Sequence, residues 1–148
     1  MKISSIKDLH QVTKTIKKYI TVGDTILLYG EIGVGKTTFT RLLINDLNTN
    51  SKKIEVLSPT FNIVLEYKIK KINIRHFDLY RIKHKKELDN IGIFENTNEN
   101  ITIIEWPELL EKKPKNRLDL YFKYSKDMKA RYVKIFKYGS LKNYELRL

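Results

Sequence analysis

Cysteine is absent from the 148 residues of this chain, which excludes disulfides, thiolate metal sites and a thiol nucleophile. No apolar run approaches the roughly 18 residues that a membrane-spanning helix needs. Residues 1–10 contain no apolar stretch of the kind found in signal peptides. These absences predict a cytoplasmic protein that makes no contact with membranes.

Linkers, repeats and low-complexity tracts are also missing, so we expect a single domain over residues 1–148. Histidine occurs only three times, which with the lack of cysteine disfavours a zinc site. The six arginines are scattered, unlike the arginine-bearing lid of a small kinase, and the guanine signature Asn-Lys-x-Asp of GTPases is absent. The chain does have 41% hydrophobic residues, enough to form a buried core.

Positive charge is in excess, with 29 Lys and Arg against 17 Asp and Glu. A skew toward Lys, Ile and Asn is what an AT-rich coding sequence produces, whatever the function. The charge is uneven, because residues 112–148 hold 12 Lys and Arg against 3 Asp and Glu. This basic third either faces nucleic acid or an acidic partner, or reflects composition alone. Its interleaved aromatic residues suit base stacking, although their alternation is more typical of a core or hairpin face: Tyr121, Phe122, Tyr124, Tyr132, Phe136 and Tyr138.

The hydrophobic patterns predict alternating helices and strands, with antiparallel pairs in the middle and at the end of the chain. Ser5 and Asp8 resemble a capping box at the start of the first helix. The expected helices cover residues 5–20, 36–47 and part of 84–96. The expected strands cover residues 25–29, 54–57, 61–69, 72–78, 101–104, 117–124 and 131–138, with a turn at Lys70-Lys71. This order predicts an α/β fold with a mixed sheet.

A glycine-rich phosphate loop lies between the strand at 25–29 and the helix at 36–47. It matches G-x-x-x-x-G-K-[ST] with Gly30, Glu31, Ile32, Gly33, Val34, Gly35, Lys36 and Thr37. Glycines let the backbone wrap around phosphates with its N–H groups pointing inward, and the helix N-terminus adds favourable partial charge. Lys36 is expected to reach the β- and γ-phosphates of ATP, and the Thr37 hydroxyl to ligate Mg²⁺.

Further candidate residues follow other strands. Glu105 directly follows the strand expected at 101–104. It is the expected second metal ligand at the carboxyl edge of the sheet, a position at which Asp is more common than Glu. Asp78 would orient water or hold the metal through water, unless it only caps a turn. Thr60 follows Pro59 in a loop suited to sensing the γ-phosphate, or in a plain turn. Trp106 would stack near the nucleotide, anchor a partner or pack in the core, and His76 is more typical of a structural hydrogen-bonder than of a base.

Four segments together make the chain similar to the TsaE (YjeE) family over nearly its whole length. They are Gly30-Glu31-Ile32-Gly33-Val34-Gly35-Lys36-Thr37-Thr38-Phe39, Ser58-Pro59-Thr60-Phe61, His76-Phe77-Asp78-Leu79-Tyr80-Arg81 and Ile104-Glu105-Trp106-Pro107-Glu108. The resemblance implies a P-loop NTPase-like mixed sheet flanked by helices, with added antiparallel strands. It also implies a slow Mg-ATPase that assists TsaB and TsaD in making tRNA N6-threonylcarbamoyladenosine, with tRNA reached indirectly through that complex.

The resemblance also implies roles by position. Lys36, Thr37 and Thr38 match nucleotide contacts, and Glu105 matches the metal-linked acid. Asp78 matches a second functional carboxylate, Thr60 a switch-like loop, and Trp106 a tryptophan near the nucleotide. The family often has Thr near the adenine in its N-terminal segment, where this chain aligns Leu9 or His10.

The resulting hypothesis is attack of water on the γ-phosphoryl group of Mg-ATP. In it Lys36, Asp78 and Glu105 are the catalytic residues, and Thr37 and Glu105 hold the metal. Two alternatives stay open at this point. One is a small P-loop kinase, and the other is a basic RNA-binding module with a vestigial ATP site.

Overall fold

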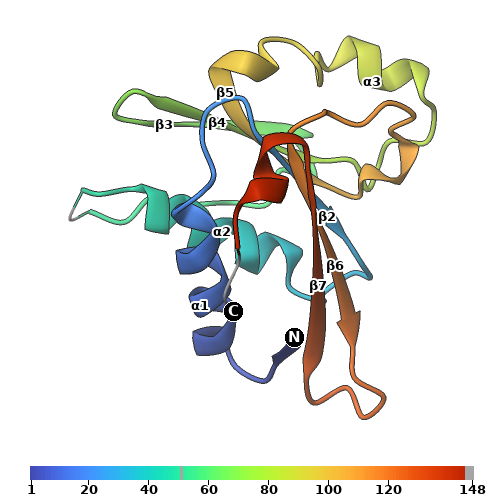
Figure 1. Ribbon diagram of the computed structural model, residues 1–148. Coiled ribbons are helices and arrows are strands. Elements are labelled where there is room, and N and C mark those ends of the chain that lie inside the picture. Colours follow the sequence, from blue (N-terminus) through green and yellow to red (C-terminus); the bar gives the residue numbers. More distant parts are fainter. Residues whose placement is uncertain (51, 146–148) are drawn as a thin grey trace.

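The computed structural model describes residues 1–50 and 52–145, and its centre is a seven-stranded mixed sheet (Figure 1). The helices are α1 (Ile6–Lys17), α2 (Lys36–Leu47) and α3 (Lys86–Asn90), with 3₁₀ turns at Thr97–Glu99, Pro107–Leu109 and Gly139–Asn143. The strands are β1 (Lys2–Ile3), β2 (Thr25–Tyr29), β3 (Val64–Ile69), β4 (Ile72–Asp78), β5 (Asn100–Glu105), β6 (Arg117–Tyr124) and β7 (Arg131–Tyr138).

The strand order is β1-β7-β6-β2-β5-β4-β3, with β6, β2, β5 and β4 parallel and the outer strands added antiparallel. The predicted α/β mixed sheet with added antiparallel strands is therefore confirmed. Leu28 pairs with Glu105, and Glu105 with Asp78, so the ends of β2, β5 and β4 meet at one edge of the sheet. This edge, next to the loop that leads into α2, is where an α/β sheet usually binds its ligand.

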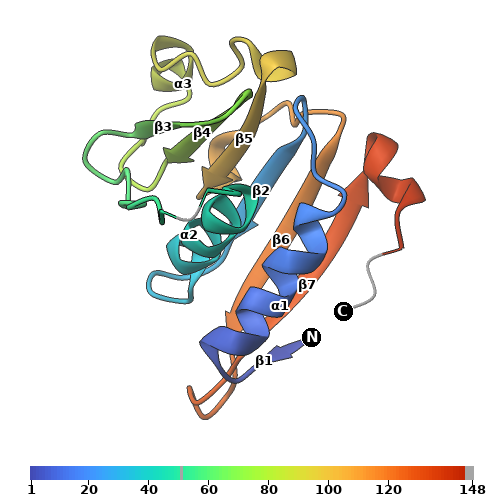
Figure 2. The same ribbon diagram turned by 90° about the vertical axis from the view of Figure 1, so that its left-hand side faces the viewer.

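Helices α1 and α2 cover one face of the sheet (Figure 2). The predicted capping box starts α1, because the Asp8 amide donates to the Ser5 hydroxyl at 3.2 Å and the Ser5 amide donates to the Asp8 carboxylate at 3.0 Å. The helix ends at Lys17 rather than at residue 20. The largest apolar cluster lies between these helices and the sheet, and its fully buried members include Ile16, Phe39 and Leu43.

The other face of the sheet is covered over β2, β5 and β4 only. Leu27, Phe77 and Ile104 point there into a second apolar cluster, closed by Leu88 of α3 and by Leu110. In Figure 1 no helix covers the corresponding side of β6 and β7 within the described ranges. The sheet is therefore half-covered on this face, because its second layer consists only of the segments that connect β4 to β5 and β5 to β6.

Two predictions in the middle of the chain are wrong. Residues 54–57 form no strand, because side chains of α2 bind their backbone: Asn45 bonds both the amide and the carbonyl of Ile54, and Arg41 donates to the carbonyl of Val56. The strand expected over 61–69 begins only at Val64. Ile63 has a φ of 67°, outside the extended region, so the apolar alternation before it does not continue the strand.

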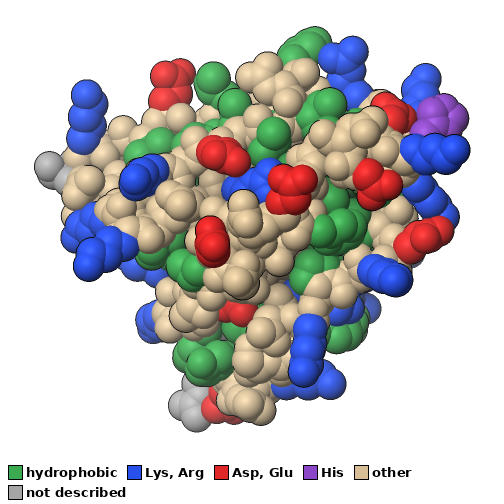
Figure 3. Space-filling model, turned by 90° about the horizontal axis from the view of Figure 1, so that it is seen from above, with side chains coloured by type: hydrophobic (Ala, Val, Ile, Leu, Met, Phe, Trp, Pro, Cys, Tyr) green, Lys and Arg blue, Asp and Glu red, His purple; other side chains and the backbone are tan. Residues whose placement is uncertain are grey.

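The face of the molecule seen from above is mixed in charge despite the basic composition. Seen from above, Lys and Arg side chains project around much of the periphery, with Asp and Glu among them (Figure 3). None of the helices in residues 1–50 and 52–145 has both the length and the apolar character needed to span a bilayer.

Candidate nucleotide site

The conformation of the phosphate loop depends on its glycines and on hydrogen bonds from its lysine. Gly30 and Gly35 have φ values of 133° and 117°, which side chains rarely tolerate. Lys36 Nζ donates to the carbonyl oxygens of Gly30 at 2.6 Å and Glu31 at 2.9 Å, so the amine spans the loop it follows. The loop is thus shaped around the lysine head group, with α2 beginning directly beneath it.

Lys36 also lies over the only tryptophan, with Nζ 3.8 Å from the ring centroid of Trp106. Trp106 adopts a left-handed conformation (φ 57°), and its amide donates to the carbonyl of Leu28 at 3.2 Å, which turns the ring toward the loop. Burial lowers the pKa of Lys36, and the nearby carboxylates of Glu105 and Asp78 act against that shift. A buried cation without a carboxylate ion-pair partner in the described residues is suited to an anionic ligand.

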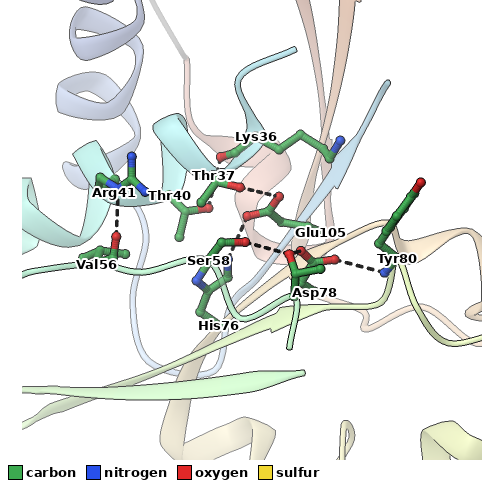
Figure 4. Close-up of polar contacts among 11 residues, drawn as sticks. Lys36, Thr37, Thr40, Arg41, Val56, Ser58, His76, Asp78, Tyr80 and Glu105 are labelled. Carbon is green, nitrogen blue, oxygen red and sulfur yellow. Dashed lines mark hydrogen bonds and ion pairs between the residues drawn. The ribbon is translucent and has the colours of Figure 1, made fainter. Parts of the chain in front are cut away.

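Glu105 is held from two sides at the end of β5 (Figure 4). The Thr37 hydroxyl donates to its Oε2 at 3.0 Å, and His76 Nε2 lies 2.8 Å from its Oε1. His76 has no solvent-exposed surface and Glu105 has 2%. With the carboxylate ionised, Nε2 must carry the proton of this bond, since a carboxylate only accepts. The hydrogen bond expected of His76 is therefore made to Glu105, and it fixes the position of the carboxylate that is expected to bind the metal.

Asp78 ends a second chain of hydrogen bonds (Figure 4). The Thr60 hydroxyl donates to Asp78 Oδ2 at 2.6 Å, and the Ser58 hydroxyl lies 2.8 Å from that of Thr60. The Tyr80 amide donates to Asp78 Oδ1 at 3.0 Å. The loop after Pro59 is thereby attached to the end of β4, where it borders the phosphate loop.

Apart from His76, the side chains that form these bonds line one cleft of about 240 Å³. Of the predicted residues, its wall contains Ile32, Gly33, Gly35, Lys36, Thr37, Thr38, Thr60, Asp78, Glu105 and Trp106. Gly30 and Glu31 contribute through the carbonyls that bind Lys36. Sequence reasoning did not select Ser58 or Tyr80 as site residues, although both stand within the family segments and both line the cleft.

A second cavity, of about 380 Å³, lies on the other side of the same loop. The two cavities share Gly33, Gly35 and Thr38, and Val34 lines the second. Its other walls come from the start of α1, including Leu9, and from Phe122 of β6. His10 is not part of the wall; its Nε2 bonds Asp46 of α2 at 2.7 Å.

Fold and site together define the class: a P-loop-like α/β protein with a mixed sheet and a Lys-Thr-Glu-Asp cluster at the carboxyl edge of its parallel strands. Among known families, the model described as threonylcarbamoyl adenosine biosynthesis protein TsaE matches residues 3–133. The chain therefore belongs to the TsaE family.

Individual relatives agree with this assignment. The tRNA threonylcarbamoyladenosine biosynthesis protein TsaE of Rickettsia prowazekii (strain Madrid E) is 37% identical over 109 residues, covering 74% of each chain. The protein of the same name from Bacillus subtilis (strain 168) is 31% identical over 118 residues, which cover 78% of this chain and 72% of the relative. The crystal structure of Bacillus subtilis YdiB superposes with a TM-score of 0.74 at 25% identity, covering 94% of this chain and 84% of that one.

Proposed function

We propose that this protein binds Mg-ATP and hydrolyses it, supporting tRNA threonylcarbamoyladenosine synthesis by TsaB and TsaD in the cytoplasm. The observation that carries the proposal is the bond between Thr37 of the phosphate loop and Glu105, 68 residues away in the sequence. A P-loop hydroxyl and an acid from a neighbouring strand are the two protein ligands that P-loop ATPases give to the metal.

The residues present fit Mg²⁺ and a triphosphate. Mg²⁺ prefers oxygen ligands and keeps several waters, so the Thr37 hydroxyl and the Glu105 carboxylate would suffice together with phosphate oxygens. When bound, the ion would neutralise charge on the β- and γ-phosphates. Lys36 Nζ, now shared between two loop carbonyls, has three donor protons to offer the phosphates instead.

Asp78 is the residue we assign to the attacking water. Its carboxylate lines the cleft with Lys36 and Glu105, and its Oδ2 accepts from Thr60 while Oδ1 accepts from a backbone amide. Held in this way, the carboxylate can accept a hydrogen bond from water and orient it toward the γ-phosphoryl group. Thr60 lies where a loop that senses the γ-phosphate is needed, so its contact with Asp78 would report on the state of the nucleotide.

The nucleoside would occupy the 380 Å³ cavity, because a nucleotide whose phosphates lie on the loop must extend to one side of it. This cavity has apolar walls from Ile6, Leu9 and Phe122 next to the shared residue Thr38. The assignment favours Leu9 over His10 as the N-terminal residue near the adenine.

Partner dependence is supported by apolar side chains left exposed around the phosphate cleft. Ile32, at the tip of the loop, is 69% exposed, and Phe61 is 84% exposed, with Arg81 over its ring. Leu57 and Tyr80 are also more than half exposed. Exposed apolar groups around a polar site are typical of a protein–protein contact. We therefore propose that TsaB and TsaD cover this rim and complete the site.

The test is release of phosphate from ATP by the purified chain, alone and with TsaB and TsaD from the same organism. A slow rate that rises with the partners supports the proposal. Lys36→Ala should lower the rate by about 10²–10³-fold, as loss of a transition-state contact does. Lys14→Ala, which removes an exposed lysine of α1, is the matched control and should have no effect.

Two results would contradict parts of the proposal separately. Full activity in Lys36→Ala would remove the ATPase assignment. A rate that the partners leave unchanged would remove only the partner dependence. Transfer of the phosphoryl group to an acceptor, instead of phosphate release, would favour the kinase alternative; the cleft has no arginine in its described wall.

A further inference from the structure

The uncovered side of β6 and β7 carries a regular array of aromatic and basic side chains, which we name the aromatic–basic face. Tyr121, Tyr132 and Phe136 are 40%, 45% and 48% exposed, and Lys123 and Lys134 are exposed between them. Because side chains alternate across a strand, all of these residues point away from α1 and α2. The face consists of Arg117, Tyr121, Lys123, Tyr132, Lys134, Phe136 and Tyr138.

The strand register places rings and cations opposite one another. Tyr121 pairs with Lys134, and Lys123 pairs with Tyr132. In the first pair the ring belongs to β6, and in the second it belongs to β7. Arg117 pairs with Tyr138, and its guanidinium lies 3.7 Å from the centre of that ring. The result is a chequered surface in which each exposed cation has an aromatic ring as its cross-strand neighbour.

The rings of this face are held by aromatic neighbours on adjacent strands. Tyr121 stacks on the buried Tyr29 of β2, with centroids 4.3 Å apart and planes 7° from parallel. Phe136 meets Tyr121 edge-on at 5.6 Å. Aromatic contacts of these two geometries are favourable beyond the area that they bury. The rings are therefore held in place while one side of the array faces solvent.

The cations of the face are available to a ligand. Lys123 and Lys134 form no ion pair with any residue in the described ranges. Asp119 is the acidic residue on this side of β6; it is 1% exposed and bonded to Arg117 at 2.9 Å. The exposed groups of the array are consequently rings and positive charges.

We propose that the aromatic–basic face binds single-stranded RNA, with unpaired bases stacking on the rings and phosphates contacting the lysines. Sheets that present aromatic rings among Lys and Arg bind RNA in this way, because every base has a face to stack and every nucleotide has a phosphate. A protein partner fits less well, since Lys is depleted from the centre of protein interfaces and here lies between the rings.

This inference goes beyond the proposed ATPase activity and does not depend on it. Family membership supplies a source of such RNA, namely a loop of tRNA in which the bases are unpaired. It differs from the expectation that tRNA is reached only through the partner complex. Three of the twelve Lys and Arg of residues 112–148 lie on this face: Arg117, Lys123 and Lys134.

The test is fluorescence anisotropy of the full chain, without nucleotide, against a labelled RNA hairpin with a single-stranded loop and a blunt RNA duplex, over a range of salt concentrations. The hairpin should bind more tightly than the duplex. Phe136→Ser should weaken hairpin binding about tenfold, as loss of one base–ring stack does. Lys123→Ala with Lys134→Ala should reduce the slope of log affinity against log salt by about 1.4, the value for two phosphates on a single strand.

Matched controls distinguish binding at this face from non-specific binding of RNA to exposed rings and lysines elsewhere. Phe94→Ser removes another half-exposed ring, and Lys7→Ala with Lys14→Ala removes two exposed charges from α1. Neither control should change hairpin binding, and circular dichroism should show all variants folded. Equal losses in the controls, or equal binding of the duplex, would overturn the proposal. Unchanged RNA binding by Phe136→Ser, with weaker association to TsaB and TsaD, would also overturn it and make the face a protein interface.

Discussion

His76 Nε2 lies 2.8 Å from Oε1 of Glu105, and both side chains are buried at the carboxyl edge of the sheet. The other oxygen of the same carboxylate accepts from Thr37. Removing the imidazole would take away the hydrogen bond to one carboxylate oxygen, and Thr37 would be the remaining side-chain partner of Glu105 in the described residues. The position of the expected metal ligand therefore depends on a residue that does not line the cleft.

We predict that His76→Ala raises the Mg²⁺ concentration needed for ATP binding by about 10–100-fold, the usual effect of losing a partner of a metal ligand. His76→Gln, which keeps a donor, should recover part of this loss. The measurement is a Mg²⁺ titration of ATP affinity by calorimetry. His10→Ala is the matched control, because it removes a comparable bond to Asp46 away from the cleft. An equal effect of His10→Ala would refute the positioning role.

Trp106 fluorescence should report nucleotide binding directly. Its ring is covered by Lys36 at 3.8 Å, and a triphosphate would draw the amine away from it. Because Trp106 is the only tryptophan, ATP should change the emission of the protein, and Trp106→Phe should abolish the signal. Lys36→Ala should remove most of the change even at nucleotide concentrations that saturate the site. Emission that ATP leaves constant in the wild-type protein would contradict the proposed location of the phosphates.

ATP affinity should fall with rising pH, and the fall should begin at a lower pH than it would for a lysine with an ordinary pKa. The pKa of Lys36 is lowered by burial in the free protein, so its charge is lost at a lower pH than usual. Phosphates favour the protonated amine. At pH values between the lowered pKa and the ordinary pKa of lysine, ATP binding therefore requires Lys36 to take up a proton. Affinity measured from neutral to alkaline pH should show this decline, and Lys36→Arg should flatten it because arginine stays charged. A steep decline retained in Lys36→Arg would assign the effect to another group.

Alanine at two glycines of the phosphate loop should separate collision from backbone strain. A Cβ on Gly30 would lie 2.5 Å from the carbonyl oxygen of Phe122, whereas one on Gly35 would meet nothing within 4 Å. Both have positive φ, which costs about 1–3 kcal/mol for other residues. Gly30→Ala should therefore lower the free energy of unfolding by more than Gly35→Ala does, as measured by urea denaturation. Equal losses would mean that β6 yields to the added methyl group.

Local patterns were sufficient for much of the fold. The strand over Thr25–Tyr29 and the helix over Lys36–Leu47 were predicted with their observed ends, because an apolar run and a helical apolar period are visible within each segment. The antiparallel pair of β6 and β7 was predicted in the same way. Segment 54–57 failed because Asn45 and Arg41, from a neighbouring helix, occupy the backbone groups that a strand would offer.

The candidate site shows the same division. The proximity of Glu105 to the phosphate loop follows from the rule that parallel strands end at one edge, and the Thr37 bond agrees with it. The attachment of Thr60 to Asp78, the bond from His76 and the second cavity beside Leu9 depend on how distant segments pack. No local pattern states those distances.

The phosphate loop, the main helices and strands, and the family could all be predicted, because each of these is encoded in short runs of residues and in their spacing. Short runs of residues do not predict which side of β6 and β7 stays uncovered, or which groups bond Glu105. Both depend on strand order and register, and these are set by the packing of the whole sheet.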